Sequence, residues 1–140
     1  MKTICRIAGL AVVACAILFR PSFLRAQGAQ EVYPALSPSE ARETIAKRSG
    51  DPGFVLLDVR TPKEFYKERI DGAVMVDYLS PTFRNEMAKL DRRRTYLVYC
   101  RTGNRTNGAL KVMRELGFRD VYDVSGGITK WKEAGFPTAR

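Results

Sequence analysis

Residues 95–106 read TYLVYCRTGNRT, and this segment is the most informative part of the chain because it joins a buried strand to a helix. Residues 95–99 are rich in β-branched and aromatic side chains, which favour strands. Residues 106–116 carry apolar side chains at the i, i+3, i+4 and i+7 spacing of one helix face. The stretch therefore predicts a strand, a tight loop and a helix, with Cys100 at the carboxyl end of the strand.

The same alternation of strand and helix continues on both sides of this stretch. Short apolar runs predict further strands at residues 54–59, 73–77 and 121–124. Helix-start signals and apolar spacing predict further helices at residues 38–48, 62–69, 80–90 and 128–134. This order predicts an α/β domain over residues 31–140, with a central parallel sheet of about four to five short strands and helices on both faces. Ligands of such sheets bind beyond the carboxyl ends of the strands, which points to Cys100.

Composition excludes several classes of site. The chain has 140 residues, which allows one domain, and its 45% apolar and 28% charged residues are typical of a globular protein. It contains no histidine, which excludes a Ser-His-Asp or Cys-His active site and any histidine metal ligand. The three cysteines form no C-x-x-C pair, so neither a zinc site nor a dithiol redox centre is expected.

The net charge of +9 comes from 24 basic and 15 acidic residues. Four of the basic residues lie in the first 30 residues, which contain no acid, so the rest of the chain carries +5. That charge favours small anions and is too low to indicate a nucleic-acid partner.

The first 30 residues resemble a leader. Residues 1–6 are positively charged, and residues 7–19 are continuously apolar or small. As a helix, this apolar run spans about 20 Å, less than the roughly 30 Å core of a bilayer. We therefore expect residues 1–30 to be a secretory signal peptide or an uncleaved membrane anchor plus linker, and the protein to be exported to the periplasm or another extracytoplasmic compartment. Lipidation at Cys15, in a lipobox-like segment, is a further alternative, and residues 27–35 are expected to be a linker.

The loop after the 95–99 strand has the composition of an anion site. A tight loop that enters a helix turns successive N–H groups toward one point, with the helix dipole behind them. Gly103 can supply the positive φ that such a loop needs, and Asn104 tolerates it. Arg101 and Arg105 are expected to add two fixed positive charges. Together these groups favour the thiolate of Cys100, which makes it a candidate nucleophile without a histidine.

This loop resembles the active-site loop of single-domain rhodaneses, and other segments match that family in order. They are residues 57–60 (LDVR), residues 62–65, residues 70–73, Gly126-Gly127, and Trp131 to Pro137. The resemblance covers residues 37–138 and departs from the family pattern at residues 68–71, where Gly-His-Ile-Pro is frequent. It implies a sulfurtransferase with Cys100 as catalytic nucleophile and persulfide carrier. The substrate cradle would be Arg101, Thr102, Gly103, Asn104 and Arg105.

The implied reaction moves sulfur from a small anionic donor such as thiosulfate to cyanide or a thiol, without metal or organic cofactor. One alternative is a non-enzymatic sulfur carrier or interaction module that a partner protein loads. A second is a rhodanese-related phosphatase or arsenate reductase. Those enzymes have a longer Cys-x5-Arg loop, whereas Arg105 stands at a Cys-x4-Arg spacing and position 106 is threonine.

Asp58 and Arg60 stand at the predicted end of the 54–59 strand. They are expected to support the active loop through hydrogen bonds, with a charge pair to Glu64 or a neighbour as the alternative. Trp131 is expected in the core. The chain shows no strong heptad pattern or long apolar face, so a monomer is expected.

Overall fold

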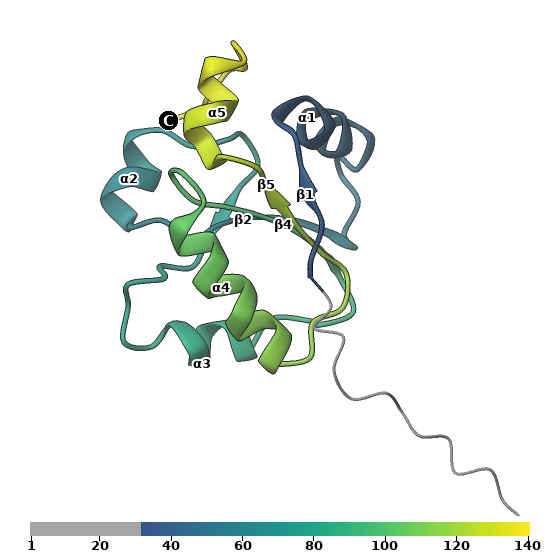
Figure 1. The fold of residues 1–140 in the computed structure, drawn as a ribbon, viewed down its shortest axis with the longest axis vertical. Coiled ribbons are helices and arrows are strands. Elements are labelled where there is room, and N and C mark those ends of the chain that lie inside the picture. The colour runs from purple at the N-terminus through teal and green to yellow at the C-terminus, as the bar shows by residue number, and fades with distance from the viewer. Residues whose placement is uncertain (1–31) are drawn as a thin grey trace, which may run out of the picture. The chain divides into compact units, whose positions relative to one another are not determined.

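The structure, a computed structural model, describes residues 32–140, which form a five-stranded parallel sheet with helices on both faces (Figure 1). The strands are β1 (Ala35–Leu36), β2 (Phe54–Asp58), β3 (Val74–Met75), β4 (Thr95–Tyr99) and β5 (Val121–Val124). The helices are α1 (Pro38–Lys47), α2 (Pro62–Lys67), α3 (Phe83–Ala88), α4 (Asn104–Glu115) and α5 (Gly127–Glu133). The strand order is β1-β5-β4-β2-β3, so β4 lies at the centre. The predicted α/β fold is confirmed.

The sheet separates two hydrophobic clusters because successive side chains of a strand point to opposite faces. On β4, Tyr96 and Val98 join the cluster beneath α3 and α4, whereas Leu97 and Tyr99 join the cluster beneath α1 and α5. Trp131 of α5 is buried in the second cluster, as expected. Both faces of β4 are therefore buried, which explains why its sequence is apolar throughout.

Helices α1 and α2 begin as their sequences predict. The Ser37 hydroxyl accepts the Glu40 N–H at 3.3 Å, and the Glu40 carboxylate accepts the Ser37 N–H at 2.8 Å. Thr61 and Glu64 form the same reciprocal capping box at the start of α2. Such a box satisfies backbone donors that the first helical turn leaves free. At α2 it also fixes Glu64 beside the loop that follows β4.

Four boundaries differ clearly from the prediction. Ala35–Leu36 is a strand rather than the end of a linker, because it pairs with β5 and Tyr33 is buried beside it. The 73–77 strand shortens to Val74–Met75, and the 80–90 helix to Phe83–Ala88. Helix α4 begins at Asn104, two residues before the predicted start, since Gly103 takes the left-handed conformation that caps it.

The predicted leader, residues 1–30, lies outside the described residues. Within residues 32–140, no helix is both long and apolar enough to cross a membrane.

Candidate active site

Cys100 follows the last residue of β4 and lies at the centre of the carboxyl edge of the sheet. The residue is buried, with 1% of its surface exposed. Gly103, with φ of 110°, turns the chain back so that its N–H donates to Cys100 Sγ at 3.0 Å. A residue with a Cβ rarely adopts this φ, which explains the glycine. The loop thus curls around the sulfur before α4 begins.

The surroundings of Cys100 favour its ionised form. Burial raises the pKa of the thiol, but hydrogen bonds from the Thr106 hydroxyl and from the backbone N–H groups of Thr106, Gly103 and Thr102 outweigh burial. The net effect lowers the pKa of Cys100 below its usual value. Hydrogen-bond donors at the start of α4 therefore favour the thiolate of Cys100 without a histidine.

Thr106 is the site residue that the sequence analysis missed. The sequence alone marks position 106 only as the place where the longer phosphatase loop has arginine. Its side chain is fully buried, and its hydroxyl has no hydrogen-bond partner within residues 32–140, which leaves it as a donor for the thiolate of Cys100, whose pKa it lowers. Because α4 begins at Asn104, Thr106 stands in its first turn, where side chains tilt back toward the helix start. A predicted helix that began at Asn104 instead of Thr106 would have placed Thr106 in the first turn and so indicated its role.

Arg105 does not stand as an unpaired cation, contrary to the expectation. Its guanidinium makes two hydrogen bonds to Glu64, from Nη1 to Oε2 at 2.6 Å and from Nη2 to Oε1 at 2.7 Å. These bonds, with help from Thr61, outweigh partial burial and lower the pKa of Glu64 to about 2. The pKa of Arg105 is raised by Glu64 and, to a smaller degree, by the nearby Cys100. Arg105 therefore lies within electrostatic reach of the sulfur, but its charge is balanced.

The other predicted cradle residues form the exposed rim of the loop. Arg101, Thr102 and Asn104 are exposed, whereas Gly103 is half-buried. Within residues 32–140, no carboxylate forms an ion pair with Arg101. Of the two arginines in the loop, Arg101 is thus the one whose charge is available to an anion.

Asp58 and Arg60 form a buried ion pair with each other, with Nη2 to Oδ2 at 2.7 Å. Arg60 also donates to the carbonyl oxygen of Glu68 at 2.6 Å. Its guanidinium lies 5.6 Å from the centre of the ring of Tyr99, the residue that directly precedes Cys100 in the sequence. The pair thus contacts the residue that precedes the loop. The expected hydrogen bonds from these two residues to the loop itself are not formed.

Comparison with known proteins agrees with this geometry. Residues 41–134 match the family model of the rhodanese-like domain. The chain belongs to the rhodanese-like family. It is 33% identical to the thiosulfate sulfurtransferase GlpE of Coxiella burnetii, over 77% of this chain and 94% of that protein. It is 32% identical to an uncharacterized protein of Synechocystis, over 71% of this chain and 55% of that protein, so it spans about half of that relative.

Solved rhodanese-like structures have the same fold. The crystal structure of a rhodanese-related protein from Thermoplasma volcanium superposes with a TM-score of 0.65 at 29% identity. The superposition covers 76% of this chain and 98% of the Thermoplasma chain. The rhodanese-like fold and a family that contains sulfurtransferases are therefore established for this chain.

In this rhodanese-like domain the first turn of α5 packs on the Cys100 loop and supports it. The start of α5 donates two hydrogen bonds to it, from Ile128 N to Cys100 O at 2.9 Å and from Thr129 N to Arg101 O at 3.1 Å. Gly127 lies against these same carbonyl groups, and a Cβ there would collide with both. The Gly126-Gly127 pair, which the sequence analysis used only as part of the family resemblance, therefore permits close packing of α5 on the loop.

Across residues 32–140, no cluster of three or more cysteine, aspartate or glutamate side chains is arranged to hold a metal ion. The chemistry that the site can perform is that of one activated thiolate in a ring of N–H donors.

Proposed function

We propose that this rhodanese-like domain is a sulfurtransferase that carries sulfane sulfur as a persulfide on Cys100. The observation that carries the proposal is the buried Cys100 sulfur, which receives the Gly103 N–H at 3.0 Å and has a lowered pKa. A thiolate at neutral pH is the nucleophile that this reaction needs. The sulfurtransferase name of the Coxiella relative supports the same reaction class.

The first half-reaction begins with attack by the Cys100 thiolate on the outer sulfur of thiosulfate. A Cys100–sulfur bond forms, the sulfur–sulfur bond of thiosulfate breaks, and sulfite leaves with the electron pair. The terminal sulfur of the new persulfide is anionic, and the N–H groups of the loop that stabilise the thiolate also suit this anion. No proton needs to move in this half-reaction, which fits a site without histidine.

In the second half-reaction, cyanide or a thiolate attacks the terminal sulfur of the persulfide. The new bond forms as the Cys100 persulfide bond breaks, and the thiolate is restored. Arg101 is the residue that we assign to attracting the anionic donor, because it is exposed and unpaired by any described carboxylate. Arg105 and Glu64 are assigned to holding the loop in shape.

Two observations make phosphatase or arsenate reductase chemistry the weaker candidate. The position where the longer phosphatase loop has arginine is Thr106, and this side chain is fully buried. Cys100 is 1% exposed, which favours a single sulfur atom over a bulky phosphate ester. A carrier that only a partner protein loads has the same persulfide and differs in its donor, so the donor must be tested directly.

The test is the intact mass of the full chain before and after thiosulfate, and again after cyanide. We expect a gain of one sulfur atom, about 32 Da, that cyanide removes. Cys100→Ser should abolish the gain. A variant with Cys5→Ser and Cys15→Ser retains Cys100 and is the matched control, which should gain the same mass.

Full mass gain in Cys100→Ser would refute the proposal. If thiosulfate gives no gain but a protein persulfide does, the domain is a carrier instead. If neither gives a gain and a phosphate ester is hydrolysed, the phosphatase alternative is correct.

A further inference from the structure

Helix α2, which lies beside the Cys100 loop, presents a basic face to solvent (Figure 1). Lys63, Tyr66 and Lys67 are exposed and stand at the i, i+3 and i+4 positions of α2, so they are neighbours on the surface of this helix. Tyr66 keeps 69% of its surface exposed beside the two lysines. We call these three residues the α2 face.

The two lysines of the α2 face form no ion pair within residues 32–140. The neighbouring carboxylates are bonded to other cations. Glu64 accepts two hydrogen bonds from Arg105, and Glu68 accepts one from Lys132 Nζ at 2.7 Å. Lys67 lies within electrostatic reach of Glu68, but Lys132 is the bonded partner of that carboxylate. The α2 face therefore keeps positive charge that the described acids do not balance.

The α2 face and the Cys100 loop are neighbours in the fold. The Glu64–Arg105 ion pair joins α2 to the first turn of α4, where the Cys100 loop ends. Lys63 directly precedes Glu64, and Lys67 follows it at i+3, so both lysines flank this ion pair. Arg101 of the loop is exposed and also forms no ion pair with a described carboxylate. Three uncompensated cations are thus divided between the loop and α2.

This division of charge suits a ligand longer than a small anion. Arg101 and the N–H groups of the loop are enough for a donor the size of thiosulfate. The lysines stand on a different helix, so a ligand that pairs with them while its sulfur meets Cys100 must extend across the Glu64–Arg105 ion pair. Because Cys100 is 1% exposed, a broad protein surface cannot reach its sulfur, whereas one protruding cysteine side chain can. A flexible acidic segment that contains a cysteine meets both requirements.

We propose that the α2 face selects the sulfur acceptor: with Arg101 it binds an acidic polypeptide segment whose cysteine takes the sulfur from Cys100. This inference rests on the proposed sulfurtransferase function and names its acceptor. The acceptor thiol loses its proton to water, and its thiolate attacks the terminal sulfur of the persulfide. The new sulfur–sulfur bond forms as the Cys100 persulfide bond breaks, and the electron pair returns to the Cys100 sulfur. Opposite charge across such an interface speeds encounter and excludes partners of the wrong sign.

The first test measures binding to the full chain without sulfur chemistry, by fluorescence anisotropy. The probe is the fluorescein-labelled peptide DEDGSGDED, in which serine replaces the acceptor cysteine, and the comparison peptide is NQNGSGNQN. We expect saturable binding of the acidic peptide, weakened by added salt, and at least about tenfold weaker binding of the neutral one. The double variant Lys63→Gln with Lys67→Gln should weaken binding of the acidic peptide about fivefold or more.

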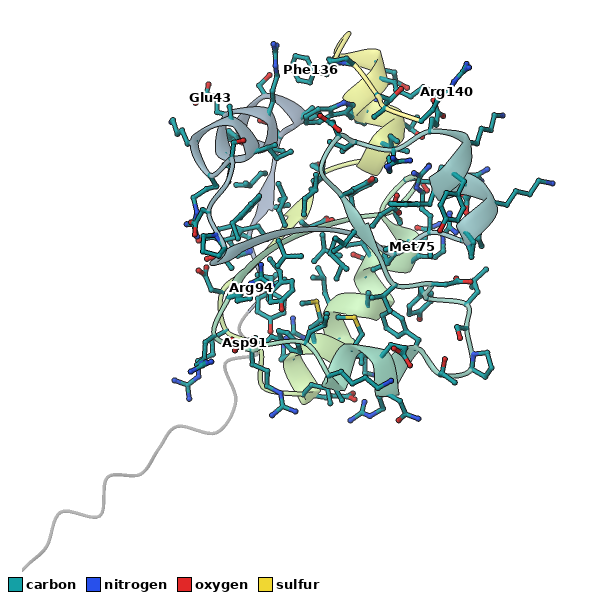
Figure 2. All side chains as sticks on the ribbon, turned by 180° about the vertical axis from the view of Figure 1, so that it is seen from behind. Glu43, Met75, Asp91, Arg94, Phe136 and Arg140 are labelled. Atoms are coloured by element: carbon teal, nitrogen blue, oxygen red, sulfur yellow. The ribbon has the colours of Figure 1, made fainter. Side chains whose placement is uncertain are left out.

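The matched control is Lys47→Gln with Lys89→Gln, which removes the same net charge from exposed lysines. Lys47 pairs with Glu43, and Lys89 pairs with Glu86. Figure 2 labels Glu43 and Asp91, which stand close to these lysines in the chain, on the side of the molecule away from α2. The control variant should bind the acidic peptide as the wild type does.

The second test follows the transfer of sulfur to the peptides DEDGCGDED and NQNGCGNQN, measured as their gain in mass after thiosulfate has loaded Cys100. We expect kcat/KM to be at least about tenfold higher for the acidic peptide, and the Lys63→Gln, Lys67→Gln variant to reduce this preference to about twofold. Equal transfer to both peptides would overturn the acceptor proposal and leave the sulfurtransferase function standing. If Cys100 takes up no sulfur, the sulfurtransferase function fails, and the binding test alone decides whether the α2 face is a docking surface.

A measurement on the unmutated protein keeps the test independent of variant folding. In ¹H–¹⁵N spectra, DEDGSGDED should shift the amide signals of residues 63–67 and 101 and leave those of residues 43–47 and 86–91 in place. Absence of saturable binding, equal affinity for the neutral peptide, or equal affinity of the two double variants would each overturn the proposal. So would shifts confined to another face of the domain.

Discussion

The guanidinium of Arg105 and the carboxylate of Glu64 meet through two parallel hydrogen bonds of 2.6 and 2.7 Å. The bond joins the first turn of α4 to α2, across a sequence separation of 41 residues. Glu64 is itself held by the capping box with Thr61, so the arrangement is rigid at both ends. This pairing sets the charge balance of the site, because it leaves Arg101 as the unpaired arginine of the loop.

Replacing Glu64 should therefore strengthen the attraction for anions. In Glu64→Gln the charge of Arg105 is no longer balanced, and it lies within electrostatic reach of Cys100. We expect the KM for thiosulfate to fall about two- to fivefold, since about 0.4–1 kcal/mol is a modest electrostatic change. The pKa of Cys100, read from the pH dependence of alkylation, should also fall. Glu133→Gln, which removes an exposed pair with Lys130, is the control and should change neither value.

Removing the Thr106 hydroxyl should make ionisation of the Cys100 thiol less favourable. Thr106→Val keeps the shape of the side chain but loses the donor that lowers the pKa of Cys100 most. Because the hydroxyl lowers the pKa of Cys100, its loss should raise that pKa, with slower persulfide formation at neutral pH. Thr106→Ser should restore the wild-type value. An unchanged alkylation profile in Thr106→Val would remove this residue from the site.

A methyl group at position 127 should displace the Cys100 loop. Gly127→Ala adds a Cβ that collides with the carbonyl groups of Cys100 and Arg101, and its φ of 59° adds backbone strain. A loop shift near 1 Å can reduce turnover about 10²-fold. Gly135→Ala is the matched control, because φ is 77° there and nothing lies within 4 Å of the new atom. The control should cost about 1 kcal/mol of stability and retain activity. Equal activity of the two variants would contradict the packing role of Gly127.

Asp123 should make the domain less stable as pH rises. Burial raises the pKa of Asp123 to about 6, and its Oδ1 has no hydrogen-bond partner within residues 32–140. Below about pH 4 the carboxyl group is protonated in both states and contributes nothing. Between about pH 4 and pH 6 it ionises first in the unfolded chain, so stability falls, by an amount on the order of 2 kcal/mol.

Asp123→Asn should therefore be more stable than the wild type at pH 7, and the difference should vanish near pH 4. Urea unfolding at both pH values measures it. The exposed Asp71→Asn is the control and should show no such pH dependence. A constant difference across this range would show that the carboxyl charge is not the cause.

Much of the fold could be predicted because its signals are local. The capping boxes at Ser37 and Thr61 start helices wherever they occur, and the apolar run of β4 can be buried on both faces only at the centre of a sheet. Strand β1 could not be predicted, because two residues carry no periodicity and become a strand only through pairing with β5. Export through residues 1–30 stays a prediction, since those residues are not described.

The kind of chemistry could be inferred from the residues alone: a cysteine after a buried strand, a glycine that allows the loop to curl, and no histidine to assist. The groups that surround the sulfur and the charges that stay free follow instead from how distant segments pack together. Arg105 is paired because α2 brings Glu64 beside α4, and Thr106 reaches Cys100 because the helix starts early. Backbone conformation follows from neighbouring residues, whereas charge pairing depends on distances between segments that are far apart in the chain.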